Sequence, residues 1–163
     1  IFTFRFFIEF TKEVQEDLKQ LMIKDSIPRT LTVVDADGVG SFLESYLNGI
    51  KEFHGGGKPQ DPRYQNLRAE CYFKLAELIN GRKLRVICTD AQRERIIDEL
   101  GCLKQAHIDN DTSKKDVIKK DEWKNLMGGK SPDYSDMLMM AMIFRRGRAT
   151  AGAQVSVKVR SSE

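Results

Sequence analysis

The chain has 163 residues, of which 40% are hydrophobic and 31% are charged, and its net charge at pH 7 is +3. This length suits one domain, and the apolar fraction excludes a disordered protein. The small positive charge permits nucleic-acid binding without demonstrating it. Three cysteines in no zinc-binding spacing indicate reduced thiols in a cytosolic protein. No apolar run reaches the roughly 20 residues that a membrane helix needs.

Strand and helix patterns alternate along the chain, which predicts an α/β fold. Short apolar runs predict strands at residues 1–10, 31–35 and 84–88. Apolar residues at helical spacing, with capping signals, predict helices at 11–27, 41–49, 67–79, 90–100, 121–127 and from Asp133 onward. A hairpin is expected between 103–108 and 117–119, a loop at 54–65, and a basic tail with a late alternating run of valines from residue 146 onward.

Asp35 stands at the carboxyl end of the strand predicted at 31–35, just before a glycine-containing turn. Ligands of open α/β sheets bind at this edge. Glycines after the aspartate let the backbone turn sharply beside the carboxylate. Taken alone, however, Asp35 is more typical of a residue that caps the turn.

Asp133 and Asp136 lie three residues apart at the start of the last predicted helix, so they share a face. Ser131 at the N-cap and Pro132 in the first turn are strong signals for this helix start. The positive end of a helix favours ionised carboxylates. Taken alone, the pair is more typical of ordinary acids at a helix start.

The three aspartates together are a sharper signal, because a strand end and a helix start can bring them into one pocket. Carboxylates are the hard oxygen ligands that Mg²⁺ and Mn²⁺ prefer. Two such ions orient a water molecule and stabilise the leaving oxygen of a phosphodiester. His54 and His107 fit no catalytic triad or zinc-protease spacing, and the chain has no complete phosphate-binding loop.

Three segments resemble motifs of one family, the nuclease domains of tailed-bacteriophage terminase large subunits. Residues 33–40 (VVDADGVG) resemble its second acidic motif, and residues 64–70 (YQNLRAE) resemble the opening of its motif helix. Most specific are residues 130–138 (KSPDYSDML), which are similar to its Ser-Pro-Asp-x-x-Asp-x-Leu motif. The order and spacing of the motifs match, and the resemblance spans residues 1–145.

The resemblance implies a ribonuclease-H-like mixed β-sheet flanked by helices on both faces, with the nuclease domain at 1–145 and a basic tail at 146–163. It implies a two-metal-ion endonuclease that uses Mg²⁺ or Mn²⁺ to cut concatemeric phage DNA during genome packaging. By position, Asp35 corresponds to the family's second catalytic acid, while Asp136 and Asp133 correspond to the last. All three are expected to be catalytic and to hold the metals.

Other motif residues receive supporting roles. Asp37 matches no family acid, so we expect a turn residue there. Arg68 and Glu70 belong to the helix motif, and we expect them to be scaffolding. Lys120 matches a frequent basic position of the family, from which it approaches a phosphate. Weaker contacts with the DNA backbone are expected from four further basic residues, for which solvated surface charge is an equally open explanation: Lys58, Arg63, Arg145 and Arg146.

The sequence departs from the family pattern at its beginning. The family's first acid lies on the opening strand of the sheet, whereas no Asp precedes Asp17 here, so we expect that strand upstream of Ile1. The family's motor ATPase domain is also absent from this chain. The implied partners are double-stranded DNA and, in the full motor, the ATPase domain, the small terminase subunit and the portal. We expect no membrane association, a monomeric isolated domain and a location in the cytoplasm of the bacterial host.

Two other interpretations remain open. Another ribonuclease-H-like nuclease, of the junction-resolvase type, shares the layout of acids and would prefer branched DNA. A catalytically silent DNA-binding or assembly module is the other, and it is favoured by the missing first acid.

Overall fold

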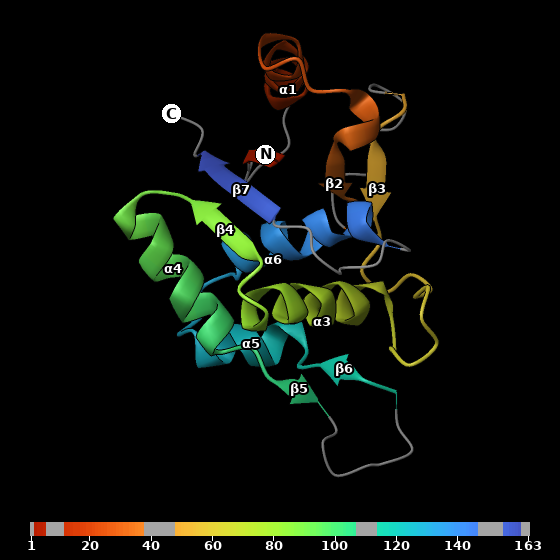
Figure 1. The fold of residues 1–163 in the computed structure, drawn as a ribbon, viewed down its shortest axis with the longest axis vertical. Helices are drawn as coiled ribbons and strands as arrows, with labels where there is room; N and C mark the ends of the chain where they lie inside the picture. Colours follow the sequence, from red (N-terminus) through yellow and green to blue (C-terminus); the bar gives the residue numbers. More distant parts are fainter. Residues whose placement is uncertain (1, 6–11, 38–47, 107–113, 147–154, 161–163) are drawn as a thin grey trace.

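The structure of the chain is a computed structural model (Figure 1). It describes residues 2–5, 12–37, 48–106, 114–146 and 155–160. Its strands are β1 (Phe2–Arg5), β2 (Val33–Asp35), β3 (Lys51–Phe53), β4 (Leu84–Ile87), β5 (Gln105–Ala106), β6 (Asp116–Val117) and β7 (Val155–Arg160). Its helices are α1 (Lys12–Lys24), α3 (Leu67–Asn80), α4 (Asp90–Gly101), α5 (Lys120–Leu126) and α6 (Asp133–Met140), with 3-10 turns η1 (Arg29–Leu31) and η3 (Ala141–Arg145).

Strand β7 is the centre of a parallel sheet with the order β1-β7-β4. Val155, Val157 and Val159 alternate along the strand and are all buried in the protein core. Residues 155–160 of the segment predicted as a basic tail therefore belong to this sheet. An alternating run of valines is typical of a strand that buries one face. Here the run lies between two partner strands. Residues 147–154 and 161–163 lie outside the described part.

Strands β2 and β3 form a second, parallel pair in which Asp35 lies opposite Phe53. The predicted strand at 31–35 is shorter than expected because Leu31 belongs to turn η1. Strand β3 was not predicted, and most of the helix predicted at 41–49 lies outside the described residues. Helix α1 packs on this pair through Leu18 and Met22, which meet Val34 and Ile50.

Helix α3 lies at the middle of the main core, where it contacts α6, η3 and strand β6 (Figure 1). Helix α4 packs against α6, and strand β2 also lies against α6. The largest buried side chains of this core include Trp123, Tyr72, Leu138 and Met142. Helix α6 is thus packed against β2, α3, α4 and η3.

Local sequence signals predicted the described helices and the hairpin. Helix α4 begins with a capping box, in which Thr89 accepts from the Gln92 amide and the Gln92 side chain accepts from the Thr89 amide. Asn66 caps α3 by accepting from the backbone N–H of Ala69. The predicted hairpin is confirmed as the antiparallel pair β5–β6. None of the helices in the described part is long and apolar enough to cross a bilayer.

Candidate active site

The first turn of α6 carries both Asp133 and Asp136, and both side chains are half-buried. The predicted N-cap role of Ser131 is wrong, since Pro132 occupies that position and gives no side-chain cap. A buried carboxylate from another helix replaces the cap: Glu99 of α4 accepts a 2.7 Å hydrogen bond from the backbone N–H of Ser135. This contact satisfies a free amide of the first turn and places negative charge at the positive end of the helix.

Glu99 is fully buried, and its other oxygen is also engaged. Arg95, one turn earlier on α4, donates to Glu99 Oε1 over 2.9 Å and to the backbone oxygen of Ser131 over 3.0 Å. The indole of Trp123 on α5 donates to the backbone oxygen of Glu99 over 3.1 Å. Burial raises the pKa of the Glu99 carboxyl, while the hydrogen bonds from Ser135 and Arg95 act in the opposite direction. Helices α4, α5 and α6 therefore meet at this residue.

The Asp136 carboxylate has a defined partner on each oxygen. The hydroxyl of Tyr72 on α3 donates to Oδ1 over 2.6 Å, and the Lys120 ammonium at the start of α5 lies 3.2 Å from Oδ2. The Asp136 side chain is 14% exposed, whereas that of Lys120 is 46% exposed. One oxygen thus faces the interior, and the other faces a basic residue at the surface.

Tyr72 is buried, and its hydroxyl remains a donor over a wide pH range. Burial raises the pKa of Tyr72 well above its ordinary value, and the neighbouring charge of Asp136 raises it further. The ring contacts Trp123 edge-on at a centroid distance of 5.4 Å. The Arg68 guanidinium lies over the Tyr72 ring at 5.2 Å and donates to the backbone oxygen of Ile118 over 3.1 Å. The predicted scaffolding role of Arg68 agrees with these contacts.

Asp35 ends strand β2 as predicted and is exposed. Its Oδ1 accepts a 3.1 Å hydrogen bond from the backbone N–H of Asp37, which is the turn-capping contact that an aspartate at this position commonly makes. Asp37 in turn accepts a 2.6 Å hydrogen bond from the backbone N–H of Gly55 and lies 3.5 Å from the His54 ring. A Cβ at Gly55 would come within 2.9 Å of Asp37 Oδ2, so a side chain at this position would displace the carboxylate. Asp37 is a turn residue, as expected.

The carboxylates do not form a complete metal site among the residues that the structure describes. In that part of the chain, no group of three or more His, Cys, Asp and Glu side chains is placed to hold an ion. Strand β2 does lie against α6, so the elements that carry Asp35 and the α6 pair are neighbours. The donors present are hard oxygens, which suit Mg²⁺ or Mn²⁺ in kind. Their number is insufficient, and a site built on them needs further oxygen ligands.

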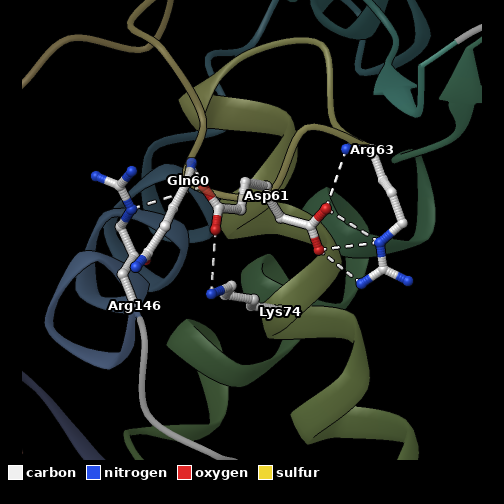
Figure 2. Close-up of polar contacts among 6 residues, drawn as sticks. Gln60, Asp61, Arg63, Lys74 and Arg146 are labelled. Atoms are coloured by element: carbon white, nitrogen blue, oxygen red, sulfur yellow. Dashed lines mark hydrogen bonds and ion pairs between the residues drawn. The ribbon is translucent and has the colours of Figure 1, made fainter.

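The basic residues that we expect to contact DNA differ in their exposure and in their ion-pair partners. Lys58 is exposed on the loop before α3, and Arg145 is half-buried in η3. Arg63 makes a two-pronged ion pair with Asp61, with a shortest distance of 2.6 Å (Figure 2). This contact and the backbone amide of Arg63 lower the pKa of Asp61 to about 2. Lys120 and Arg146 also face carboxylates.

A second buried carboxylate, Glu70 of α3, contacts residues from three segments of the chain. It accepts from the backbone N–H of Gln60 over 2.8 Å, lies 3.1 Å from the Lys74 ammonium, and lies 3.6 Å from Nε of Arg146 (Figure 2). The loop before α3 and the residue after η3 are thereby tied to the same helix. Glu70 is scaffolding, as predicted from its motif.

Sequence reasoning missed Tyr72 and Glu99, although both contact the first turn of α6. Glu99 gave a weak signal, since it lies three residues after the buried Ile96, on the apolar face of α4. Tyr72 follows the motif at 64–70 closely, but an aromatic residue in a buried helix usually indicates core packing. In neither case does the local sequence name the distant partner.

The pH dependence of stability tests the place of Glu99. Because the pKa of Glu99 is raised in the folded state, its ionisation opposes folding as the pH rises from about 4.3, the ordinary value for Glu, through the raised pKa. Glutamine keeps an oxygen for Ser135 and does not ionise. We therefore expect the free energy of unfolding of wild type to fall relative to Glu99→Gln across this window, measured by urea denaturation. Glu94→Gln, which removes an exposed carboxylate from α4, is the control. A constant difference at all pH values contradicts the assignment.

No protein-family model and no curated protein matches the sequence. The structure is similar to the "Nuclease domain of the large terminase subunit gp2 of bacterial virus Sf6", with a TM-score of 0.56 and 21% sequence identity. The match covers 78% of this chain and 70% of that chain. The chain therefore has a mixed α/β fold similar to that of this nuclease domain, as its motifs implied.

Proposed function

We propose that this chain is the nuclease domain of a phage terminase large subunit, which hydrolyses double-stranded DNA with the help of divalent metal ions. The observation that carries the proposal is the conjunction of two features. The fold is that of a terminase nuclease domain, and the motif carboxylate Asp136 is held by Tyr72 and Lys120 at the start of α6. The biological reaction would be the cutting of concatemeric DNA during packaging in the cytoplasm of the bacterial host.

Asp136 is the proposed central ligand, with Asp133 on the same helix turn and Asp35 at the end of the adjacent strand β2. Their oxygens suit Mg²⁺ or Mn²⁺, and such ions activate water and stabilise the leaving oxygen of a phosphodiester. Further ligands are required, since these carboxylates form no group of three within the described ranges. They would come from water, from the DNA or from residues outside those ranges. In the full motor we propose the ATPase domain, the small terminase subunit and the portal as partners.

Five basic residues are proposed to bind the phosphate backbone. Lys120 lies 3.2 Å from Asp136, and its half-exposed ammonium would balance the negative charge of a phosphate as well as that of Asp136. Lys58 is exposed on the loop before α3. Arg63 and Arg146 each face a carboxylate and would have to exchange that partner for a phosphate, while Arg145 is half-buried.

A catalytically silent DNA-binding module is the second candidate, and one observation favours it. The described residues hold fewer carboxylates together than a two-metal site requires. Such a module would bind DNA without cutting it in Mn²⁺. The junction-resolvase alternative would instead cut branched DNA in preference to linear DNA.

Substitution of the acids tests the nuclease proposal. In the complete natural chain with Mn²⁺, Asp136→Asn and Asp35→Asn should each lower the rate of plasmid cleavage by more than about 100-fold, because removal of a metal ligand costs more than loss of its outer partners. Asp121→Asn, which changes an acid on the neighbouring helix α5, is the control and should cut like wild type. Circular dichroism establishes that each variant is folded. Retained cutting by Asp136→Asn would falsify its proposed role.

The salt dependence of DNA binding tests the basic residues. A lysine that contacts one phosphate of duplex DNA contributes about 0.9 to the slope of log K against log salt concentration. We expect Lys58→Ala to reduce the slope by this amount, measured by fluorescence anisotropy with a catalytically inactive chain. Lys24→Ala, which removes an exposed lysine from α1, should leave the slope unchanged. Equal slopes for wild type and Lys58→Ala would show that Lys58 is solvated surface charge.

A further inference from the structure

Among the described side chains of α3, only Tyr72 donates a hydrogen bond to a proposed metal ligand, Asp136. Its hydroxyl lies 2.6 Å from Asp136 Oδ1, a short distance typical of a hydrogen bond to an ionised acceptor. The tyrosine is 1% exposed, so water does not compete effectively for this contact. Tyr72 is 64 residues away from Asp136 in sequence, and the contact is therefore a product of the tertiary fold.

The Tyr72 ring that carries the hydroxyl packs against two neighbouring side chains. Trp123 contacts the ring edge-on at 5.4 Å, and the Arg68 guanidinium lies over the ring at 5.2 Å. Arg68 also lies over Trp123 at 5.6 Å. Trp123 is fully buried and donates to the backbone of Glu99, the residue that caps α6. The donor and the helix that carries the acceptor are thus held by the same set of contacts.

A carboxylate held at one oxygen cannot rotate freely about its Cβ–Cγ bond. The Tyr72 hydrogen bond directs Oδ1 toward the interior and leaves Oδ2 on the side of Lys120. Preorganisation of this kind lowers the entropic cost of ligand binding, and the partners of metal ligands are commonly arranged in this way. The hydroxyl offers one hydrogen, so it does not engage the second oxygen.

We infer that Tyr72 is a positioning residue of the active site, which holds Asp136 through Oδ1 and presents Oδ2 to the divalent ion. This inference rests on the proposed nuclease function. It assigns to Tyr72 no contact with metal or DNA. Its effect is exerted entirely through Asp136, and it should therefore change metal affinity and turnover more than DNA affinity.

The test is Tyr72→Phe in the complete natural chain, which removes one oxygen and keeps the ring. We expect Mn²⁺ affinity, measured by isothermal titration calorimetry, and kcat for plasmid cleavage each to fall about 10- to 100-fold. The KM for DNA should change by less than about twofold. Tyr64→Phe is the matched control, since Tyr64 is also buried but its ring packs against Phe73. Tyr64→Phe should leave the Mn²⁺ affinity and kcat unchanged.

Two further measurements accompany this comparison, and the first of them needs no metal. The shifts in urea midpoint caused by Tyr72→Phe and Asp136→Asn should be non-additive, because either substitution breaks the same contact. In wild type, the Tyr72 hydroxyl proton should remain visible by NMR and shift on addition of Mg²⁺. This last observation does not depend on the folding of any variant, and disappearance of the signal on Mg²⁺ binding would overturn the inference.

The remaining outcomes separate the inference from the proposed function. Wild-type Mn²⁺ affinity and kcat in Tyr72→Phe would overturn the positioning role and leave the nuclease proposal intact. Equal losses in Tyr64→Phe would overturn it too, because they indicate a general packing effect. If wild type neither binds Mn²⁺ nor cuts DNA, the nuclease proposal itself fails. Additive urea shifts would then show that Tyr72 and Asp136 are not coupled at all.

Discussion

The first turn of α6 is held by buried groups from other helices, and the candidate site depends on this constraint. Glu99 of α4 caps the turn through the Ser135 amide, and Tyr72 of α3 holds Asp136. A buried carboxylate is costly unless it is paired and hydrogen-bonded. The protein meets that requirement at Glu99 with Arg95 and the helix amide. The buried carboxyl group of Glu99 therefore also determines where the two aspartates of α6 lie.

Glu70 performs a comparable role on α3. It joins the loop before α3 to Arg146, the residue that follows η3. Strand β7 then returns to the centre of the sheet between β1 and β4. Among the basic residues expected at DNA, Lys120 and Arg146 face the carboxylates of Asp136 and Glu70, whereas Lys58 is exposed. Their availability to DNA differs accordingly.

Features with a local cause could be predicted from the sequence. The capping box of α4, the Asn66 cap of α3 and the hairpin β5–β6 all follow from residues a few positions apart. The position of Asp35 at a strand end and of Asp133 and Asp136 at a helix start also followed from short patterns. The family motifs added the fold, which the structural likeness to a terminase nuclease domain confirms.

Features with a distant cause could not be predicted. Strand β7 pairs with β1 and β4, both far away in sequence, so its valine run had no local partner to reveal it. Ser131 has the local signature of a cap, but Glu99 takes that role because the packing of α4 on α6 brings a buried carboxylate to the amide. The Tyr72–Asp136 contact joins two helices in the same way. Asp35 was expected to lie in one pocket with Asp133 and Asp136. The structure shows that strand β2, which carries Asp35, lies against α6.

The central claim is that Asp136 is preorganised to bind a divalent cation. The most direct measurement is a crystal structure of the complete chain soaked in Mn²⁺, with the ion located by its anomalous scattering. The account predicts an anomalous peak about 2.1 Å from Asp136 Oδ2, the range of hard-cation coordination, with the Tyr72 hydroxyl still on Oδ1. A soaked crystal with no manganese at Asp136, in a protein that nevertheless cuts DNA, would contradict it.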